Sequence, residues 1–325
     1  MMNDDIAREH IPSGRPQAIV VCGSAVLDTV RLALHRWKQW DFSLPLVITG
    51  GIGHSTHYLY QVVLRDFPCV DESPLTSSNT TNVFEVANGI TVLSWPFLLQ
   101  ALRHWVETVG QTAHHDPQLT EARIMSSFLY ECLNTEEEFQ SLDDATKLLL
   151  CRRIVLEETS TNCGENAQFT LELLLQEAEP LITVGAPPKR IEIPCKDLSR
   201  CSSWWILLQD PCMMRRSVHT FQKWRDHFFL SALGDTSTKR SNDIISKDTV
   251  FFPLTTSHKD FVIHLPYDVD RYLSLLIGEV WRLRDDDKGY GPKGRAFITH
   301  CDVPQSVQET AAMLEANCLV APSRK

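Results

Sequence analysis

The chain has 325 residues, 43 % of them hydrophobic and 22 % charged, a balance that is typical of globular proteins and excludes a disordered or fibrous one. Its 41 acidic and 31 basic residues leave a formal net charge of −10, which argues against a general surface for nucleic acids or anionic membranes. No run of about 18 apolar residues is present, so we expect no membrane span.

The ten cysteines are spread along the chain without a CxxC pair or neighbouring histidines, so the spacings of structural zinc sites are missing. His114, His115 and Asp116 lie together, but no third ligand supports them, and we expect no metal there. The polar, acidic N-terminus has no signal-peptide pattern. These features favour reduced cysteines and a cytoplasmic protein.

The first predicted element is an apolar strand over residues 18–24 that ends in Gly23 and Ser24. A helix over 28–40 and a second apolar strand over 46–51 follow it. A strand, a helix and a strand of these lengths make a βαβ unit, in which the strands are parallel and the crossover is right-handed. Because both strands are apolar throughout, we expect a sheet that is covered on both faces.

A glycine-rich turn, GGIGHST, occupies residues 50–56 and leads into a predicted helix over 57–64. Three glycines at such a turn let the backbone approach a ligand closely. The dinucleotide fingerprint is incomplete, since Thr56 stands at the place of its third glycine, and there is no phosphate-binding lysine. A tight turn without a ligand explains these glycines equally well.

Residues 66–118 differ in character and read as an insertion, after which helical periodicity resumes at 120–132 with Glu121 in the first turn. The stretch 153–170 then joins an apolar strand, two carboxylates and small polar residues to a helix that starts at about Cys163. A junction of this kind can hold an anion or a polar ligand, or it can simply cap the helix.

Another apolar strand is predicted over 204–208, again followed by polar residues and a helix. Asp210, Arg215 and Arg216 at this strand end can bind a carboxylate, a phosphate or a ribose, or can form a surface salt bridge and a helix cap.

The C-terminal part is expected to contain a short strand at 250–252, a helix at 270–281 and a last short strand at 297–299. A polar, glycine-rich segment over 282–295 separates the last two of these elements.

Four strand ends therefore carry polar or glycine-rich turns, at residues 23–24, 50–56, 160–166 and 210–216. In an open parallel sheet these ends share one edge, and ligands bind there at the switch in strand order. The pattern predicts a small-molecule crevice. No nucleophile elbow, H-E-x-x-H motif or kinase signature accompanies it, so no catalytic residue is assigned.

Several of these runs carry a resemblance to a known family, namely VVCGSAV, ITGGIGHST, LEETSTNCGENAQF, ILLQDPCMMRRSVHTF and the segment from RYLSLL to CDVP. They closely resemble the YdcF-like proteins of the SanA/ElyC/YdcF-type superfamily, a domain of unknown function, over most of residues 17–304. The resemblance implies a Rossmann-like α/β core at 17–230, with a mostly parallel sheet, helices on both faces and insertions near 73–116 and 184–203. It also implies a C-terminal extension, residues 231–325, that packs on the core.

The resemblance further implies binding of S-adenosylmethionine or a related nucleotide, without a defined reaction. The superfamily often has an aromatic–His pair in its last strand-end motif, where this chain has Cys212 and Met213, and a Thr where it has Cys163. The His that would be the natural proton carrier is thus missing. The implied pocket is lined by Gly23, Gly50, Gly51, Gly53, His54, Ser55, Glu121, Glu157, Ser160, Asn162, Asn166, Asp210 and Arg216.

Three functions remain open at this point. The first is a binder of S-adenosylmethionine or a related nucleotide, which can include methyl transfer. The second is a hydrolase or transferase for a phosphorylated or glycan-lipid substrate, with His54, Glu157 and Arg216 as acid–base and anion-binding groups. The third is a regulatory binder without chemistry. In all three cases we expect a small-molecule ligand and no nucleic-acid partner. The sequence does not indicate the oligomeric state.

Overall fold

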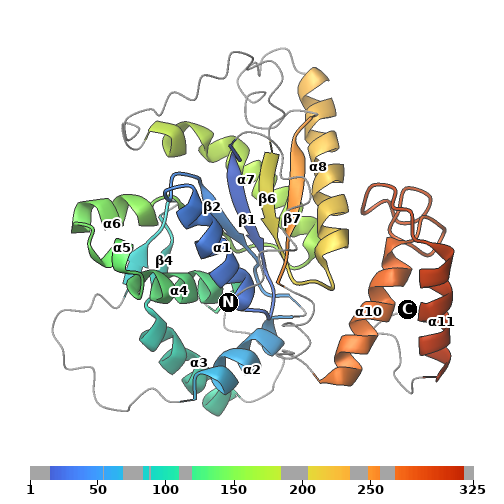
Figure 1. Cartoon of the computed structure of the whole chain (residues 1–325), viewed down its shortest axis with the longest axis horizontal. Coiled ribbons are helices and arrows are strands. Elements are labelled where there is room, and N and C mark those ends of the chain that lie inside the picture. Colours follow the sequence, from blue (N-terminus) through green and yellow to red (C-terminus); the bar gives the residue numbers. More distant parts are fainter. Residues whose placement is uncertain are drawn as a thin grey trace.

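The computed structural model describes residues 15–53, 55–68, 83–87, 89–109, 119–183, 204–234, 248–256 and 268–317. Figure 1 shows the arrangement of its elements around a central sheet. The strands are β1 (Ala18–Cys22), β2 (Leu46–Thr49), β3 (Val83–Glu85), β4 (Thr91–Leu93), β5 (Ile154–Glu157), β6 (Trp204–Leu208) and β7 (Val250–Leu254). The helices are α1 (Asp28–Gln39), α2 (Thr56–Asp66), α3 (Trp95–Val109), α4 (Glu121–Asn134), α5 (Glu137–Gln140), α6 (Asp144–Cys151), α7 (Cys163–Thr183), α8 (Met214–Gly234), α10 (Val269–Leu283) and α11 (Gln305–Asn317).

The main sheet has five strands in the order β5-β2-β1-β6-β7, and every pairing in it is parallel. Val20 at the middle of β1 lies between Val47 of β2 and Leu207 of β6. The prediction of an α/β, Rossmann-like fold is confirmed. Because β1 lies between the second and the sixth strand of the chain, the strand order switches between β1 and β6.

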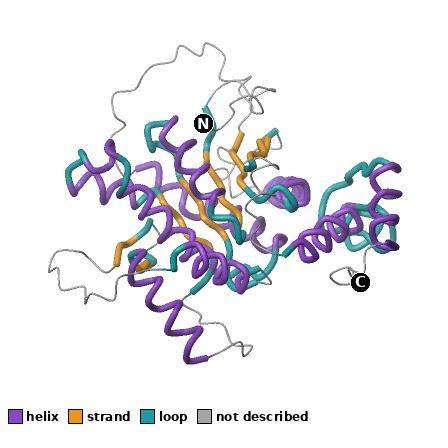
Figure 2. Tube along the Cα trace, turned by 60° about the horizontal axis from the view of Figure 1, so that its bottom comes forward, coloured by secondary structure: helices purple, strands orange, loops and turns teal. Residues whose placement is uncertain are grey.

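The two faces of the sheet are covered by different helices, because successive side chains of a strand point to opposite faces. Ile19 and Val21 of β1 belong to a large hydrophobic core shared with α1, α2, α3 and α4. Val20 and Cys22 belong to a second core with α7 and α8. Figure 2 shows the strands between these two helical layers. The sheet is thus buried on both sides, as its uninterrupted apolar strands predict.

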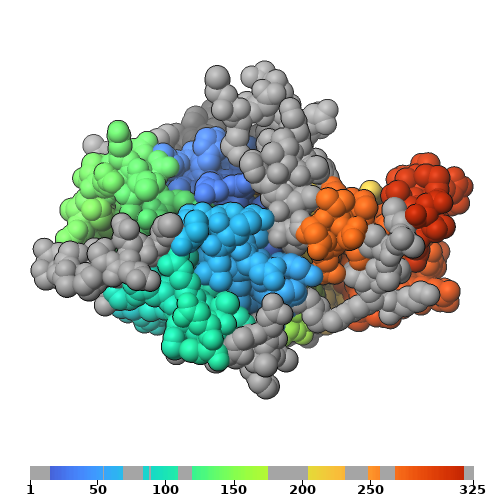
Figure 3. All heavy atoms as spheres, turned by 90° about the horizontal axis from the view of Figure 1, so that it is seen from below, coloured from blue at the N-terminus to red at the C-terminus, as the bar shows by residue number. Residues whose placement is uncertain are grey.

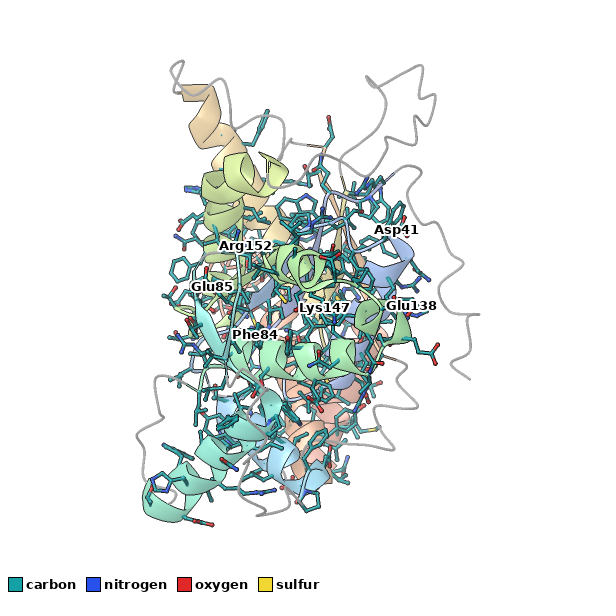
Figure 4. The ribbon with its side chains drawn as sticks, turned by 90° about the vertical axis from the view of Figure 1, so that its left-hand side faces the viewer. Asp41, Phe84, Glu85, Glu138, Lys147 and Arg152 are labelled. Atoms are coloured by element: carbon teal, nitrogen blue, oxygen red, sulfur yellow. The ribbon has the colours of Figure 1, made fainter. Side chains whose placement is uncertain are left out.

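The insertion expected near residues 73–116 contains, in its described part, the β3–β4 hairpin and α3. Phe84 of β3 stacks on Tyr130 of α4 with ring centroids 4.2 Å apart, and Figure 4 shows this side of the molecule with Phe84 labelled. The hairpin therefore packs on α4, away from the carboxyl edge of the main sheet. The second expected insertion, 184–203, lies outside the described residues.

The C-terminal region differs from the sequence-based expectation in two ways. The core does not end at residue 230, because β7 pairs along its whole length with β6, from Trp204 opposite Val250 to Leu208 opposite Leu254. The predicted strand at 297–299 is wrong, since Phe297 and Ile298 both donate their backbone N–H groups to the carbonyl of Tyr290 and so form a turn. Beyond β7, α10 and α11 pack on each other beside α8 (Figure 1).

Among the described helices, none has both the length and the apolar character needed to span a bilayer. The described cysteines, Cys22, Cys132, Cys151, Cys163, Cys212 and Cys301, are all free thiols.

Candidate functional site

A cavity of about 1120 Å³ lies at the carboxyl edge of the sheet. Its floor is made by the turns that follow β1, β2, β5 and β6, the four strand ends that the sequence singles out. Its other wall comes from α10, the loop that follows α10, and α11. The cavity therefore occupies the crevice at the switch in strand order, where open α/β sheets bind ligands.

Most of the predicted site residues line this cavity, but not all. Gly51 and Glu157 are not part of the lining, and His54 lies outside the described residues. The residues that the cavity brings together are Gly23, Gly50, Gly53, Ser55, Glu121, Ser160, Asn162, Asn166, Asp210 and Arg216.

Glu121 lies at the first turn of α4 and directs its carboxylate back over the glycine turns. Its Oε1 accepts hydrogen bonds from Ser55 Oγ at 2.7 Å and from Thr56 Oγ1 at 3.0 Å. A Cβ atom on Gly23 would lie 2.1 Å from Glu121 Oε2, so any side chain at the end of β1 would have to displace this carboxylate. A Cβ atom on Gly50 would also contact Glu121 Oε2, at 3.1 Å, and the φ of Gly50 is +149°, a value that favours glycine. The glycines thus make room for a carboxylate that is 4 % exposed.

The Glu121 Oε2 atom makes no hydrogen bond within the described residues, so it is available to a ligand donor. Burial raises the pKa of Glu121, the hydrogen bonds from Ser55 and Thr56 lower it in part, and the charge of Asp210 raises it further. The carboxyl can therefore take up a proton more readily than an exposed glutamate.

Asp210 and Ser24 meet across the switch point, with Ser24 Oγ 3.3 Å from Asp210 Oδ2. Asp210 Oδ1 accepts the backbone N–H groups of Cys212 and Met213, both at 3.1 Å, and so caps the start of α8. Burial raises the pKa of Asp210 to about 6, against the effect of these hydrogen bonds. Asp210 is therefore a helix cap, as the sequence suggests, and it also lines the cavity.

Glu157 has a structural role. Its Oε1 accepts Thr159 N at 2.7 Å, Thr159 Oγ1 at 2.9 Å and Ser160 N at 2.9 Å. Its Oε2 accepts Thr49 Oγ1 at 2.6 Å and Ser160 Oγ at 2.5 Å. With five donors on two oxygens, the carboxylate ties the turn after β5 to β2. Gly51 serves the same junction, since a Cβ there would lie 2.4 Å from the carbonyl oxygen of Ser160.

The start of α7 supplies the amides of the site. Asn162 Oδ1 accepts Gly164 N at 2.9 Å and Glu165 N at 3.1 Å, so this residue is the helix cap that the sequence suggests. Asn166, one turn later, is 6 % exposed and lines the cavity, and its side-chain amide makes no hydrogen bond within the described residues. Burial raises the pKa of the nearby Cys163 thiol, which keeps it protonated and weakly nucleophilic.

Arg216 connects the floor to the opposite wall. Its Nε donates to Glu279 Oε2 at 2.7 Å, and Arg282 Nη1 donates to Glu279 Oε1 at 2.8 Å. Glu279 is 4 % exposed, so this cluster of two arginines and one glutamate is largely buried. Burial opposes the charge of Arg216, but the charge of Glu279 and its hydrogen bond raise the pKa overall, and the guanidinium stays protonated.

Sequence reasoning missed the wall that faces the strand ends. One face of α10 lines the cavity through Arg271, Leu275, Gly278, Glu279 and Arg282, whose spacing is that of one helical face. Arg271 lies over the ring of Tyr58 in α2, 5.2 Å from its centroid. Seen from below, α2 in light blue and the start of α10 in orange lie on the same face of the molecule (Figure 3).

Trp281 of α10 also lines this wall, and the loop after α10 adds Arg284, Asp287, Lys288, Tyr290 and Arg295. The signal in the sequence was the segment RLRDDDKGYGPKGR, which combines glycines with many charges, but nothing in it indicates which charges face the cavity.

The site combines buried carboxylates and amides on the floor with cations on the opposite wall. Such an arrangement can bind a polar organic ligand by its hydroxyl or ammonium groups and by its anionic groups. Within the described residues, no group of three His, Cys, Asp or Glu side chains is placed to hold a metal ion, and His114 to Asp116 lie outside them. A comparison with models of known protein families finds no match for this chain.

Proposed function

We propose that this protein binds S-adenosylmethionine or a related nucleotide in the cavity at the carboxyl edge of its sheet. The observation that carries the proposal is the amide of Asn166, which is buried in the cavity wall without a hydrogen-bond partner among the described residues. An amide that lines a cavity and has no protein partner is available to both a donor and an acceptor of a ligand.

The chemistry around Asn166 favours a nucleoside. The free Oε2 of Glu121 and the carboxylate of Asp210 accept hydrogen bonds, as ribose hydroxyls and an ammonium group require. A sulfonium cation is also favoured beside these two acids. The resemblance to YdcF-like proteins supports the same ligand class.

The proposal is tested by calorimetric titration of the protein with S-adenosylmethionine, S-adenosylhomocysteine and adenosine. We expect Asn166→Ala to weaken binding of the adenosyl compounds by about 10-fold, the effect of losing one or two hydrogen bonds to a ligand. Gln168→Ala is the matched control, because Gln168 is an amide on the same helix that pairs with Glu172 at 2.9 Å and does not line the cavity. If no adenosyl compound binds, or if both variants behave alike, the proposal is wrong.

A second candidate is a hydrolase or transferase, and Asp210 is the observation that favours it. A buried carboxyl in the cavity with a pKa of about 6 can donate a proton to a leaving oxygen near neutral pH, while water or another acceptor attacks the substrate. Asp210→Asn should then abolish turnover of a phosphorylated or glycan substrate and leave its binding in place. Equal turnover by both forms excludes this role, and binding without any turnover favours a regulatory binder.

A further inference from the structure

In the loop after α10, residues 284–304, Asp285 and Asp286 form hydrogen bonds and ion pairs within the loop. Asp286 Oδ1 accepts the backbone N–H groups of Lys288 and Gly289, both at 3.0 Å, and pairs with Arg284. Asp285 Oδ1 accepts Lys293 N at 2.7 Å, and its Oδ2 lies 2.6 Å from His300 Nδ1. Two of the three consecutive aspartates therefore hold the loop together.

Two cations of the same loop are left without acidic partners. Lys288 and Arg295 line the cavity, and neither forms an ion pair within the described residues. Arg295 lies over the ring of Tyr290, 5.7 Å from its centroid. Two acids also line this end: Asp287 is exposed, and Glu315 accepts Trp281 Nε1 at 3.0 Å.

The loop presents these cations from a fixed backbone. Tyr290 N donates to the carbonyl of Arg282 at 2.8 Å, and Arg295 N donates to the carbonyl of Gly289 at 3.0 Å. A Cβ on Gly289 would lie 1.9 Å from the carbonyl oxygen of Arg284, so the loop folds tightly on itself. Thr299 joins it to α8 through His219 at 2.8 Å. A loop with a fixed backbone loses less entropy when it binds an anion than a flexible one does.

We propose that Lys288 and Arg295 bind the phosphate of an elongated ligand whose other end lies on the strand-end turns. A lysine ammonium acts as a point charge towards phosphate, and an arginine guanidinium can bind two of its oxygens at once. Glu279 contacts both Arg216 and Arg282 but can neutralise only one of these two positive charges. The remaining positive charge adds to the attraction for a phosphate. The inference rests on the proposed function in that both use one cavity.

The length of the cavity favours a nucleotide over a single small phosphate ester. Arg271 and Arg282 mark the two ends of the cavity-lining face of α10, and at 1.5 Å per residue they are about 16 Å apart along the helix. The loop follows the far end of α10 from α2 (Figure 1). A ligand that reaches along this face from the α2 end to the loop is therefore elongated, as a nucleoside with a phosphate chain is.

The probe for the phosphate subsite is inorganic pyrophosphate, titrated into the protein by calorimetry at low and moderate salt. We expect binding that weakens with salt, and a loss of about 10-fold in each of Lys288→Gln and Arg295→Gln. Lys293→Gln is the matched control, because Lys293 is exposed on the same loop, carries the same charge and does not line the cavity. Absence of pyrophosphate binding, or an equal loss in all three variants, overturns the proposal.

A second comparison separates this inference from the proposed function. Adenosine, ADP and glucose 1-phosphate are titrated into the same proteins, and we expect ADP to bind about 10-fold tighter than adenosine only where Lys288 and Arg295 are intact. If ADP and adenosine bind equally well, the subsite is wrong while the nucleoside function stands. If pyrophosphate and glucose 1-phosphate bind in a Lys288-dependent way but adenosine and ADP do not, the nucleoside function is wrong while the subsite stands.

Discussion

Arg216 of α8 and Glu279 of α10 form an ion pair with the two side chains 13 % and 5 % exposed, and this pair joins the C-terminal helices to the sheet domain. Taking one charge of a buried pair away leaves the other uncompensated, which destabilises far more than removing both. The cavity wall is therefore held in part by a buried charge pair between two elements that lie far apart in the chain.

Glu279→Leu should lower the free energy of unfolding by about 3 kcal/mol, because it leaves the Arg216 guanidinium buried without its acceptor. The double variant Arg216→Met/Glu279→Leu should recover most of that loss. Urea denaturation measures both. As a control, Asp28→Asn removes the exposed pair with Arg31 and should change stability by less than about 1 kcal/mol. A double variant no more stable than the single one would contradict the prediction.

The pH dependence of stability should carry the signature of Asp210. Its pKa is raised to about 6 in the folded protein from the usual value near 4, so the folded state keeps a proton that the unfolded chain releases. This contribution is fully present below about pH 4 and is lost as the pH rises through about 6, at a cost of up to about 3 kcal/mol. Asp210→Asn should remove that decline. Chemical denaturation of both forms between these pH values tests it, and parallel curves would refute it.

Gly23→Ala should destabilise the fold by about 1–3 kcal/mol, because the new methyl group would overlap Glu121 Oε2 at 2.1 Å beside the carbonyl of Thr49 at 3.1 Å. Gly278→Ala is the comparison. The nearest atoms there belong to the end of the Arg282 side chain, at 3.0 Å, which can move, and alanine favours a helix interior by up to about 1 kcal/mol. Thermal unfolding of the two variants should therefore shift in opposite directions. A neutral Gly23→Ala would show that Glu121 has room to withdraw.

Glu157→Gln should lower the free energy of unfolding by about 2–3 kcal/mol. The new NH₂ group replaces an oxygen that accepts hydrogen bonds, and it cannot accept them from the donors around it. Glu158→Gln is the control on the same turn. Glu158 pairs with Arg123 and accepts Thr120 Oγ1 at 3.0 Å, and its 14 % exposed side chain contributes less, about 1 kcal/mol. Denaturant midpoints measure the difference. If the two variants are equally stable, Glu157 does not hold the turn as its hydrogen bonds indicate.

The sequence predicted the sheet and the strand ends well because their signals are local. Uninterrupted apolar runs bounded by Gly23-Ser24 or by Asp210 specify buried parallel strands, and such strands gather their carboxyl ends at one edge. The different roles of the acidic residues could not be predicted from the sequence. Glu121 and Glu157 look alike in the sequence, but only the folded chain shows that five donors saturate Glu157 and leave one oxygen of Glu121 open.

The opposite wall was not predictable for a related reason. Glu279 sits in an amphipathic helical pattern that is equally typical of a solvated face, and its partner Arg216 is 63 positions earlier in the chain. Strand β7 falls in the segment that the family resemblance assigns to the C-terminal extension, and its Pro253 is a residue that weakens a strand signal. Its place at the sheet edge is where proline is tolerated.

Ser24 and Asp210, the pair that spans the switch point, are 186 positions apart in the chain. During synthesis β1 can pair with β2 as soon as the first fifty residues have emerged, but the second neighbour of β1 is made only after more than half of the protein. Pairings of such long sequence separation are slow and come late in folding. The crevice at that junction is therefore among the last parts of the molecule to assemble, and a nascent chain that stops short of β6 has a sheet but no binding site.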